Sequence, residues 1–236
     1  MQQNQSTLLP FLVELRSRLL RCFFVLCVFL SVLLYFADKL YTLLAQPLLK
    51  FLPQGHLIAT QIVAPFFVPF KLALLASFLL TMPFFLYQLW AFAAPALYPH
   101  EKRFAWPLLF LSTLLFYAGM LFAYWVIFPL LFRFLTQAVP QGVTMSPDIT
   151  QYLDFTLNML LIFGVLFEIP IIMLLLALSG LVTRARFVKM RPYALVGAFI
   201  LGMLLAPPDV LSQTILAVPI WLLFELGILL LPTNSC

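Results

Sequence analysis

Residues 152–181 read YLDFTLNMLLIFGVLFEIPIIMLLLALSGL, a predominantly apolar run with one glutamate, Glu168, near its middle. A run of this length can cross a bilayer, because a spanning helix needs about 20 apolar residues at about 1.5 Å rise per residue. A carboxylate at that depth costs on the order of 3 kcal/mol or more, so it indicates a functional site by default. The alternative is a structural glutamate, protonated in place or bonded to a neighbouring helix.

The composition of the whole chain places it in a membrane. Hydrophobic residues make up 64% and charged residues 9%, whereas a soluble domain carries about 25% charged residues. The apolar runs are unbroken and lack the alternation that barrel strands need, so we predict an all-α integral membrane protein. The net charge of +5 does not indicate nucleic-acid binding, because the basic residues fall in short clusters between the apolar runs.

Residues 1–236 are predicted to form a single membrane domain with six transmembrane helices. Residues 1–18 form a cytoplasmic segment with an amphipathic helix at the interface. The fifth helix is short, since about 14 residues cover only about 21 Å of a hydrocarbon core about 30 Å thick. We therefore expect a thinned bilayer around the fifth and sixth helices. The expected spans are about 19–36, 66–94, 104–132, 152–179, 193–205 and 211–231.

The lysines and arginines predict that the N- and C-termini both lie in the cytoplasm. Nine of these cations fall on the side of the N-terminus and four on the other, and cytoplasmic loops carry the excess. The nine are Arg16, Arg18, Arg21, Lys102, Arg103, Arg184, Arg186, Lys189 and Arg191, and the four are Lys39, Lys50, Lys71 and Arg133.

Two carboxylates, Glu14 and Glu101, share the predicted cytoplasmic face. Acidic groups on a basic face can bind a pair of guanidinium groups bidentately, a geometry that lysine cannot reproduce. Each also has a structural alternative. Glu14 is spaced to pair with Arg18 one turn later, and Glu101 follows Pro99 at a helix start, where a negative charge is favourable.

Two further positions accompany the last three spans. Pro170 follows Glu168 by two residues and predicts a kink, because proline removes a backbone hydrogen bond. Asp209 follows a Pro-Pro pair and precedes Gln213, so its structural alternative is a helix cap. The sequence has no motif of a serine hydrolase, a zinc protease or a phosphate loop, so we predict no enzyme, no metal site and no cofactor.

Six segments, in order, resemble the TatC family, the multi-spanning receptor subunit of the bacterial twin-arginine translocase. The resemblance covers nearly the whole chain. The segments are ELRSRL at 14–19, QLWAFAAPALY at 88–98, HEKR at 100–103, FGVLFEIP at 163–170, RPY at 191–193 and PPDVLSQ at 207–213.

The resemblance implies a function and a set of site residues. The family binds twin-arginine signal peptides and exports folded proteins across the bacterial cytoplasmic (inner) membrane, driven by the proton motive force. It implies TatA- and TatB-type single-span partners, self-association in a larger complex, and a curved, glove-like fold with short fifth and sixth helices. The implied signal-peptide residues are Glu14, Arg16, Phe92 and Glu101; the implied partner contacts are Glu168 and Gln213; Pro47 and Asp209 match positions in the extracytoplasmic loops.

The sequence departs from the family pattern at Phe11, where many relatives have histidine, and in its brief tail ending at Cys236. Another class of function stays open beside the resemblance. An ion-coupled small-molecule transporter could use Glu168 as a proton carrier, although no inverted repeat of the kind found in many transporters is visible. A purely structural membrane scaffold would tolerate the loss of Glu14 and Glu101.

Overall fold

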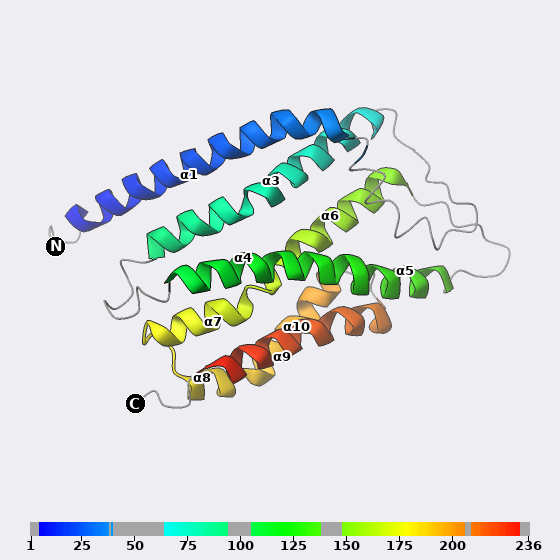
Figure 1. Ribbon diagram of the computed structural model, residues 1–236. Helices are drawn as coiled ribbons and strands as arrows, with labels where there is room; N and C mark the ends of the chain where they lie inside the picture. Colours follow the sequence, from blue (N-terminus) through cyan, green and yellow to red (C-terminus); the bar gives the residue numbers. More distant parts are fainter. Residues whose placement is uncertain are drawn as a thin grey trace.

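The computed structural model describes residues 5–37, 39, 64–93, 105–137, 148–205 and 209–231, and the regular elements of these residues are helices (Figure 1). In chain order they are α1 (Gln5–Leu33), η1 (Leu34–Phe36), α3 (Ala64–Ala93), α4 (Ala105–Phe122), η4 (Ala123–Ile127), α5 (Phe128–Gln137), α6 (Ile149–Leu166), α7 (Ile169–Leu178), α8 (Arg184–Lys189), α9 (Arg191–Leu205) and α10 (Val210–Leu230).

Five helical segments of the described chain are long and apolar enough to cross a membrane. They are Val13–Phe36, Phe66–Ala91, Trp106–Thr136, Ile149–Leu178 and Val210–Leu230. The prediction of an all-helical membrane fold is thereby confirmed. Large apolar side chains remain exposed along these segments, among them Phe24, Phe110 and Trp125, as expected of surfaces that face lipid rather than water.

The last two helices differ in length. The apolar helix α9 has 15 residues, so it is about 22 Å long and too short to cross the hydrocarbon core while upright. By contrast, α10 has 21 residues and is long enough to cross. It is the shortest of the five candidate spans of the described chain, and its bounds agree with the expected span 211–231. The side chain of Asp209 caps its first turn, and Pro219 inside it does not end it.

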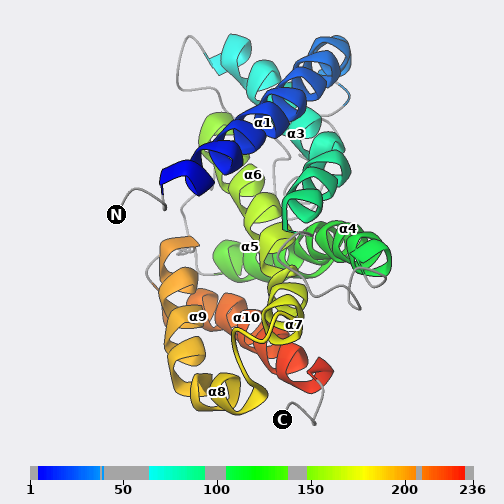
Figure 2. The same ribbon diagram turned by 90° about the vertical axis from the view of Figure 1, so that its left-hand side faces the viewer.

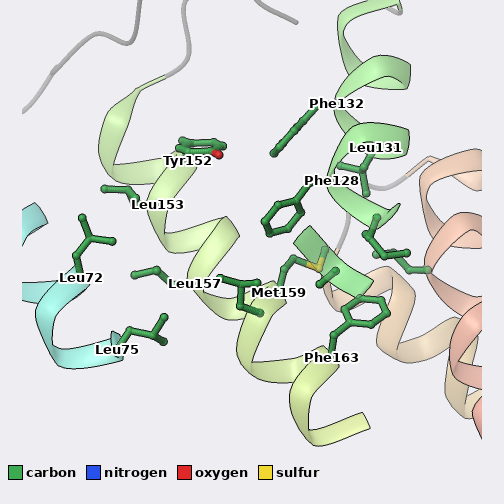
Figure 3. Close-up of a cluster of buried hydrophobic side chains, with 14 of the residues drawn as sticks. Leu72, Leu75, Phe128, Leu131, Phe132, Tyr152, Leu153, Leu157, Met159 and Phe163 are labelled. Carbon is green, nitrogen blue, oxygen red and sulfur yellow. The ribbon is translucent and has the colours of Figure 1, made fainter. Parts of the chain in front are cut away.

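Helix α6 lies at the centre of the fold and carries the main core cluster. Its residues Leu153, Met159 and Phe163 are almost completely buried. Figure 3 shows these side chains directed towards Leu72 and Leu75 of α3 on one side and towards a row of aromatic and leucine side chains of α5 on the other. Close packing of this kind fixes α3, α5 and α6 relative to one another.

The fourth span is broken rather than merely kinked. Helix α6 ends at Leu166 and α7 begins at Ile169, with Glu168 at the junction. Pro170 occupies the first turn of α7, where its missing N–H is tolerated. The predicted kink at this proline is confirmed as a two-residue interruption of the helix, and Glu168 lies within that interruption.

The third span contains a wide turn that the sequence did not predict. Residues Ala123–Ile127 form a π-helix, η4, between α4 and α5. Ala123 and Ile127 are buried there, and Trp125 is exposed. Such single wide turns are rare and are inserted into otherwise regular α-helices.

The starts and ends of the helices gather at two ends of the molecule. The beginning of α1, the end of α7, the short helix α8 and the end of α10 lie together at the left of Figure 1, and the view from that end in Figure 2 shows them in front. Because α1 runs without a break from Gln5 to Leu33, the amphipathic lead-in expected before the first span is continuous with it.

Candidate functional site

Glu14 forms an ion pair within α1 that the helical spacing predicts. Arg18 Nη2 donates to Glu14 Oε1 at 2.7 Å, and Arg18 Nε donates to the same oxygen at 3.1 Å. The structural alternative for Glu14 therefore describes a real contact. This ion pair uses only one oxygen of the carboxylate. Among the described residues no donor contacts the second oxygen, Oε2, and 43% of the Glu14 side chain is exposed.

Arg18 does more than pair with Glu14, and no sequence pattern indicated this role. Its Nη1 donates to Oε1 of Gln88 at 3.0 Å, and its Nη2 lies 3.4 Å from the carbonyl oxygen of Ala91. Gln88 and Ala91 belong to the last turns of α3, and Gln88 is buried. The guanidinium therefore fixes the Glu14 turn of α1 against the end of α3.

Glu168 is buried, with 8% of its surface exposed. Ser112 of α4 donates a hydrogen bond to Glu168 Oε2 at 2.6 Å, and Oε1 has no partner among the described residues. The carboxylate borders a cavity of about 250 Å³ whose other walls include Trp90 of α3 and Ile171 of α7. A buried oxygen without a donor is costly, so this cavity can accept a polar group at Glu168.

The end of α3 connects these two sites. Trp90 lines the Glu168 cavity, while its neighbour Ala91 accepts from Arg18 of α1. Two consecutive residues of α3 therefore contact the Glu14 turn and the Glu168 cavity.

Asp209 and Gln213 lie one turn apart at the start of α10. Asp209 Oδ2 accepts a hydrogen bond from the backbone N–H of Ser212 at 2.7 Å, so the expected helix cap is present. Gln213 Nε2 donates to the carbonyl oxygen of Phe199 in α9 at 3.0 Å. The two helices approach closely here, since a Cβ on Gly202 of α9 would lie 2.9 Å from the Gln213 backbone oxygen.

Two ion pairs between helices were not predicted from the sequence. Lys71 Nζ of α3 donates to both carboxylate oxygens of Asp154 in α6, at 2.7 and 2.9 Å. Arg191 Nη2 donates to Glu225 Oε2 of α10 at 2.8 Å. A usable signal for the first pair was available: each span carries a single opposite charge within a few residues of its expected extracytoplasmic end.

The remaining predicted site residues are placed only in part. Arg16 lies on α1 and lines a groove with Ser17 and Leu20, apart from the contact between Arg18 and Glu14. Phe92 lies in the last turn of α3, and its side chain is outside the described residues. Glu101 and Pro47 also fall outside the described residues.

The comparison with known proteins identifies the family. The model of the family described as "Sec-independent protein translocase protein (TatC)" matches residues 10–219. The chain belongs to the TatC family. It is a protein-transport subunit of the bacterial inner membrane rather than an enzyme, and this assignment favours protein export over small-molecule transport.

Individual TatC proteins match along most of their length. The Sec-independent protein translocase protein TatC of Haemophilus influenzae is 52% identical over 229 residues, covering 96% of this chain and 89% of the relative. The TatC of Escherichia coli K12 is 50% identical over 227 residues, covering 96% and 88%. A crystal structure described as the twin arginine translocase receptor TatC superposes with a TM-score of 0.83 at 37% identity, covering 93% of this chain and 96% of that chain.

Proposed function

We propose that this protein is the receptor subunit of a twin-arginine translocase and binds signal peptides through Glu14 and Glu101. The observation that carries the proposal is the geometry at Glu14. Arg18 holds one carboxylate oxygen against α3, while the other is left without a donor among the described residues on a partly exposed side chain. An incoming guanidinium can use that second oxygen without displacing Arg18.

The second carboxylate, Glu101, supplies the partner for the other arginine of the signal. Each guanidinium–carboxylate contact contributes about 1.5–3 kcal/mol where it is partly desolvated. Phe92, in the last turn of α3, belongs to this site by resemblance. Arg16 belongs to the site by resemblance alone, and as a cation it does not bind the signal's arginines directly.

The proposed orientation has six spans, with both termini in the cytoplasm. The basic helix α8 lies at the same end of the molecule as the beginning of α1 (Figure 1). Arg16, Arg18 and Arg21 follow around the middle of α1. An excess of cations on one side is typical of the cytoplasmic side of membrane proteins. The short helix α9 supplies the fifth span where the bilayer is thinned.

Binding of a twin-arginine peptide to the purified full-length protein in nanodiscs tests the receptor proposal. We expect Glu14→Gln and Glu101→Gln each to weaken binding about tenfold, the loss of one charge-assisted contact, and a twin-lysine peptide to bind more weakly than the parent. Glu225→Gln is the matched control, since Glu225 is a paired carboxylate on α10 at the same end of the molecule. Equal binding by all proteins and both peptides would refute the receptor proposal.

The same subunit is proposed to hold single-span TatA- and TatB-type partners at Glu168 and Gln213 during export driven by the proton motive force. Oε1 of Glu168 has no donor among the described residues, and Glu168 lines a cavity that a polar side chain of a partner helix can enter. Gln213 uses its amide nitrogen within the chain, which leaves its carbonyl oxygen for a partner.

Co-purification of tagged partners tests the scaffold separately from the receptor. Glu168→Ala is expected to reduce partner recovery more than signal-peptide binding. Ser112→Ala, which keeps the carboxylate and removes its internal donor, is expected to retain partners. Full partner recovery with Glu168→Ala would show that the carboxylate is not a partner contact.

A further inference from the structure

A groove on α1 lies beside the proposed signal-peptide site and is not explained by it. Its volume is about 640 Å³, and it is lined by seven residues of α1 and by Phe84 of α3. The lining mixes the cations Arg16 and Arg21 and the hydroxyl of Ser17 with apolar side chains, among them Leu20 and Phe24. Cations interleaved with apolar side chains in one groove of a membrane helix favour an amphiphilic occupant.

The two arginines of this groove have no acidic partner in the part of the chain that the structure describes. Within the described residues neither Arg16 nor Arg21 has an acidic or carbonyl partner, whereas Arg18, between them in sequence, has three. Both are exposed on the helix. Burying a guanidinium stem at a membrane interface is favourable when the charged head reaches an anion.

The spacing along α1 fits the upper part of a lipid. Arg16 and Phe24 are eight residues apart, or about 12 Å along a helix. Leu20 lies between them and is 57% exposed, and Phe24 is 69% exposed. The groove therefore places two cations about 7.5 Å apart along the helix, with the apolar side chains of Leu20 and Phe24 beside them.

We propose that this groove binds an anionic phospholipid, with its phosphate at Arg16, Ser17 and Arg21 and an acyl chain on Leu20, Phe24 and Phe84. Guanidinium groups bind phosphate bidentately, and basic pockets between membrane helices select anionic headgroups. The twin-arginine segment of a signal peptide is repelled by the same two cations. Lipid at this position abuts the turn that carries Glu14 and Arg18. It would use Arg16, which the family resemblance alone assigns to the signal-peptide site, and leave the Glu14 carboxylate to the signal peptide.

Lipid titration of the full-length protein in detergent, followed by native mass spectrometry, tests the proposal. The probes are phosphatidylglycerol, which carries a net negative charge, and phosphatidylcholine, which does not. We expect the parent protein to retain phosphatidylglycerol preferentially, and Arg16→Gln with Arg21→Gln to weaken its binding about 25-fold, about fivefold for each cation removed. Arg16→Lys with Arg21→Lys is expected to recover part of the loss.

Arg186→Gln is the matched control, because Arg186 is an exposed cation on α8 at the same end of the molecule. This variant should bind phosphatidylglycerol like the parent. Equal binding of both lipids by the parent, or unchanged phosphatidylglycerol binding by the double variant, would overturn the proposal. Unchanged lipid binding together with loss of a co-purifying protein would show that the groove is instead a protein interface. No signal peptide is present, so failure here leaves the receptor proposal untouched.

Discussion

Arg18 Nη1 lies 3.0 Å from Oε1 of Gln88, although 70 residues separate them in the sequence. This contact ties the middle of α1 to the end of α3, where Gln88 is buried. The same guanidinium holds Glu14. The candidate receptor carboxylate is therefore placed by a side chain that itself makes no contact with the proposed ligand's arginines.

Replacing Arg18 with Gln is expected to loosen α1 from α3. The variant loses charge-assisted hydrogen bonds to Glu14 and Gln88, and the expected loss is about 1 kcal/mol of stability because the pair is partly exposed. The thermal-unfolding midpoint in detergent should fall, and twin-arginine peptide binding should weaken because Glu14 is no longer held in place. Arg186→Gln should change neither; identical behaviour of the two variants would show that Arg18 is not a structural tie.

Replacing Gly119 with alanine is expected to destabilise the protein. A Cβ at this position in α4 would overlap the carbonyl oxygen of Phe163 in α6 and lie 2.8 Å from the Phe167 ring. Backbone cannot move aside cheaply, so Gly119→Ala should cost about 1–3 kcal/mol. The measurement is the thermal midpoint of the purified protein.

Gly197 in α9 is the matched control for Gly119. A Cβ there meets no atom within 4 Å, so Gly197→Ala should leave stability unchanged or raise it by up to about 1 kcal/mol through helix propensity. A larger loss at Gly197 than at Gly119 would contradict the described packing of α4 on α6.

The effects of replacing Lys71 and Asp154 on stability are expected to be coupled, because the two side chains form an ion pair. Lys71→Leu alone leaves a carboxylate without its cation inside a span, and Asp154→Leu leaves the reverse, so each should destabilise the protein by about 1–2 kcal/mol. The double substitution to leucine should recover most of the loss, since it removes both charges. A double-mutant cycle on thermal stability measures this coupling, and strictly additive losses would show that the pair does not hold α3 to α6.

Asp209 is expected to stabilise the protein by capping the first turn of α10. Asp209→Asn keeps an acceptor for the Ser212 N–H and should be nearly neutral, whereas Asp209→Ala should cost about 1 kcal/mol. Thermal unfolding separates the two variants. If translocation falls in both variants to the same extent, Asp209 has a role that requires its charge.

The helices were predictable because hydrophobic length is a local property. The runs near residues 66–94 and 211–231 correspond closely to α3 and α10. The interruption beside Glu168 was also predictable, since Pro170 removes a hydrogen bond within its own helix. Helix α1 could not be bounded this way: its polar lead-in and its apolar span share one unbroken helix.

The site was predictable only where its contacts are local. The pairing of Glu14 with Arg18 and the cap at Asp209 follow from spacings of three and four residues. The hydrogen bond from Ser112 to Glu168 spans 56 residues, and serines are too common in membrane helices to mark such a donor. The π-turn η4 could not be predicted either, because its residues are apolar ones that also occur in regular membrane helices.

That wide turn affects which changes of length the third span can absorb. A π-turn holds one residue more than a regular α-helical turn over nearly the same rotation, so deleting one residue between Ala123 and Ile127 is expected to close η4 into a regular helix while Phe128 and Phe132 stay packed on α6. A deletion in the regular parts of α4 would instead rotate everything after it by about 100° and turn those rings away from the core. The third span is therefore expected to tolerate the loss of one residue better at η4 than within α4.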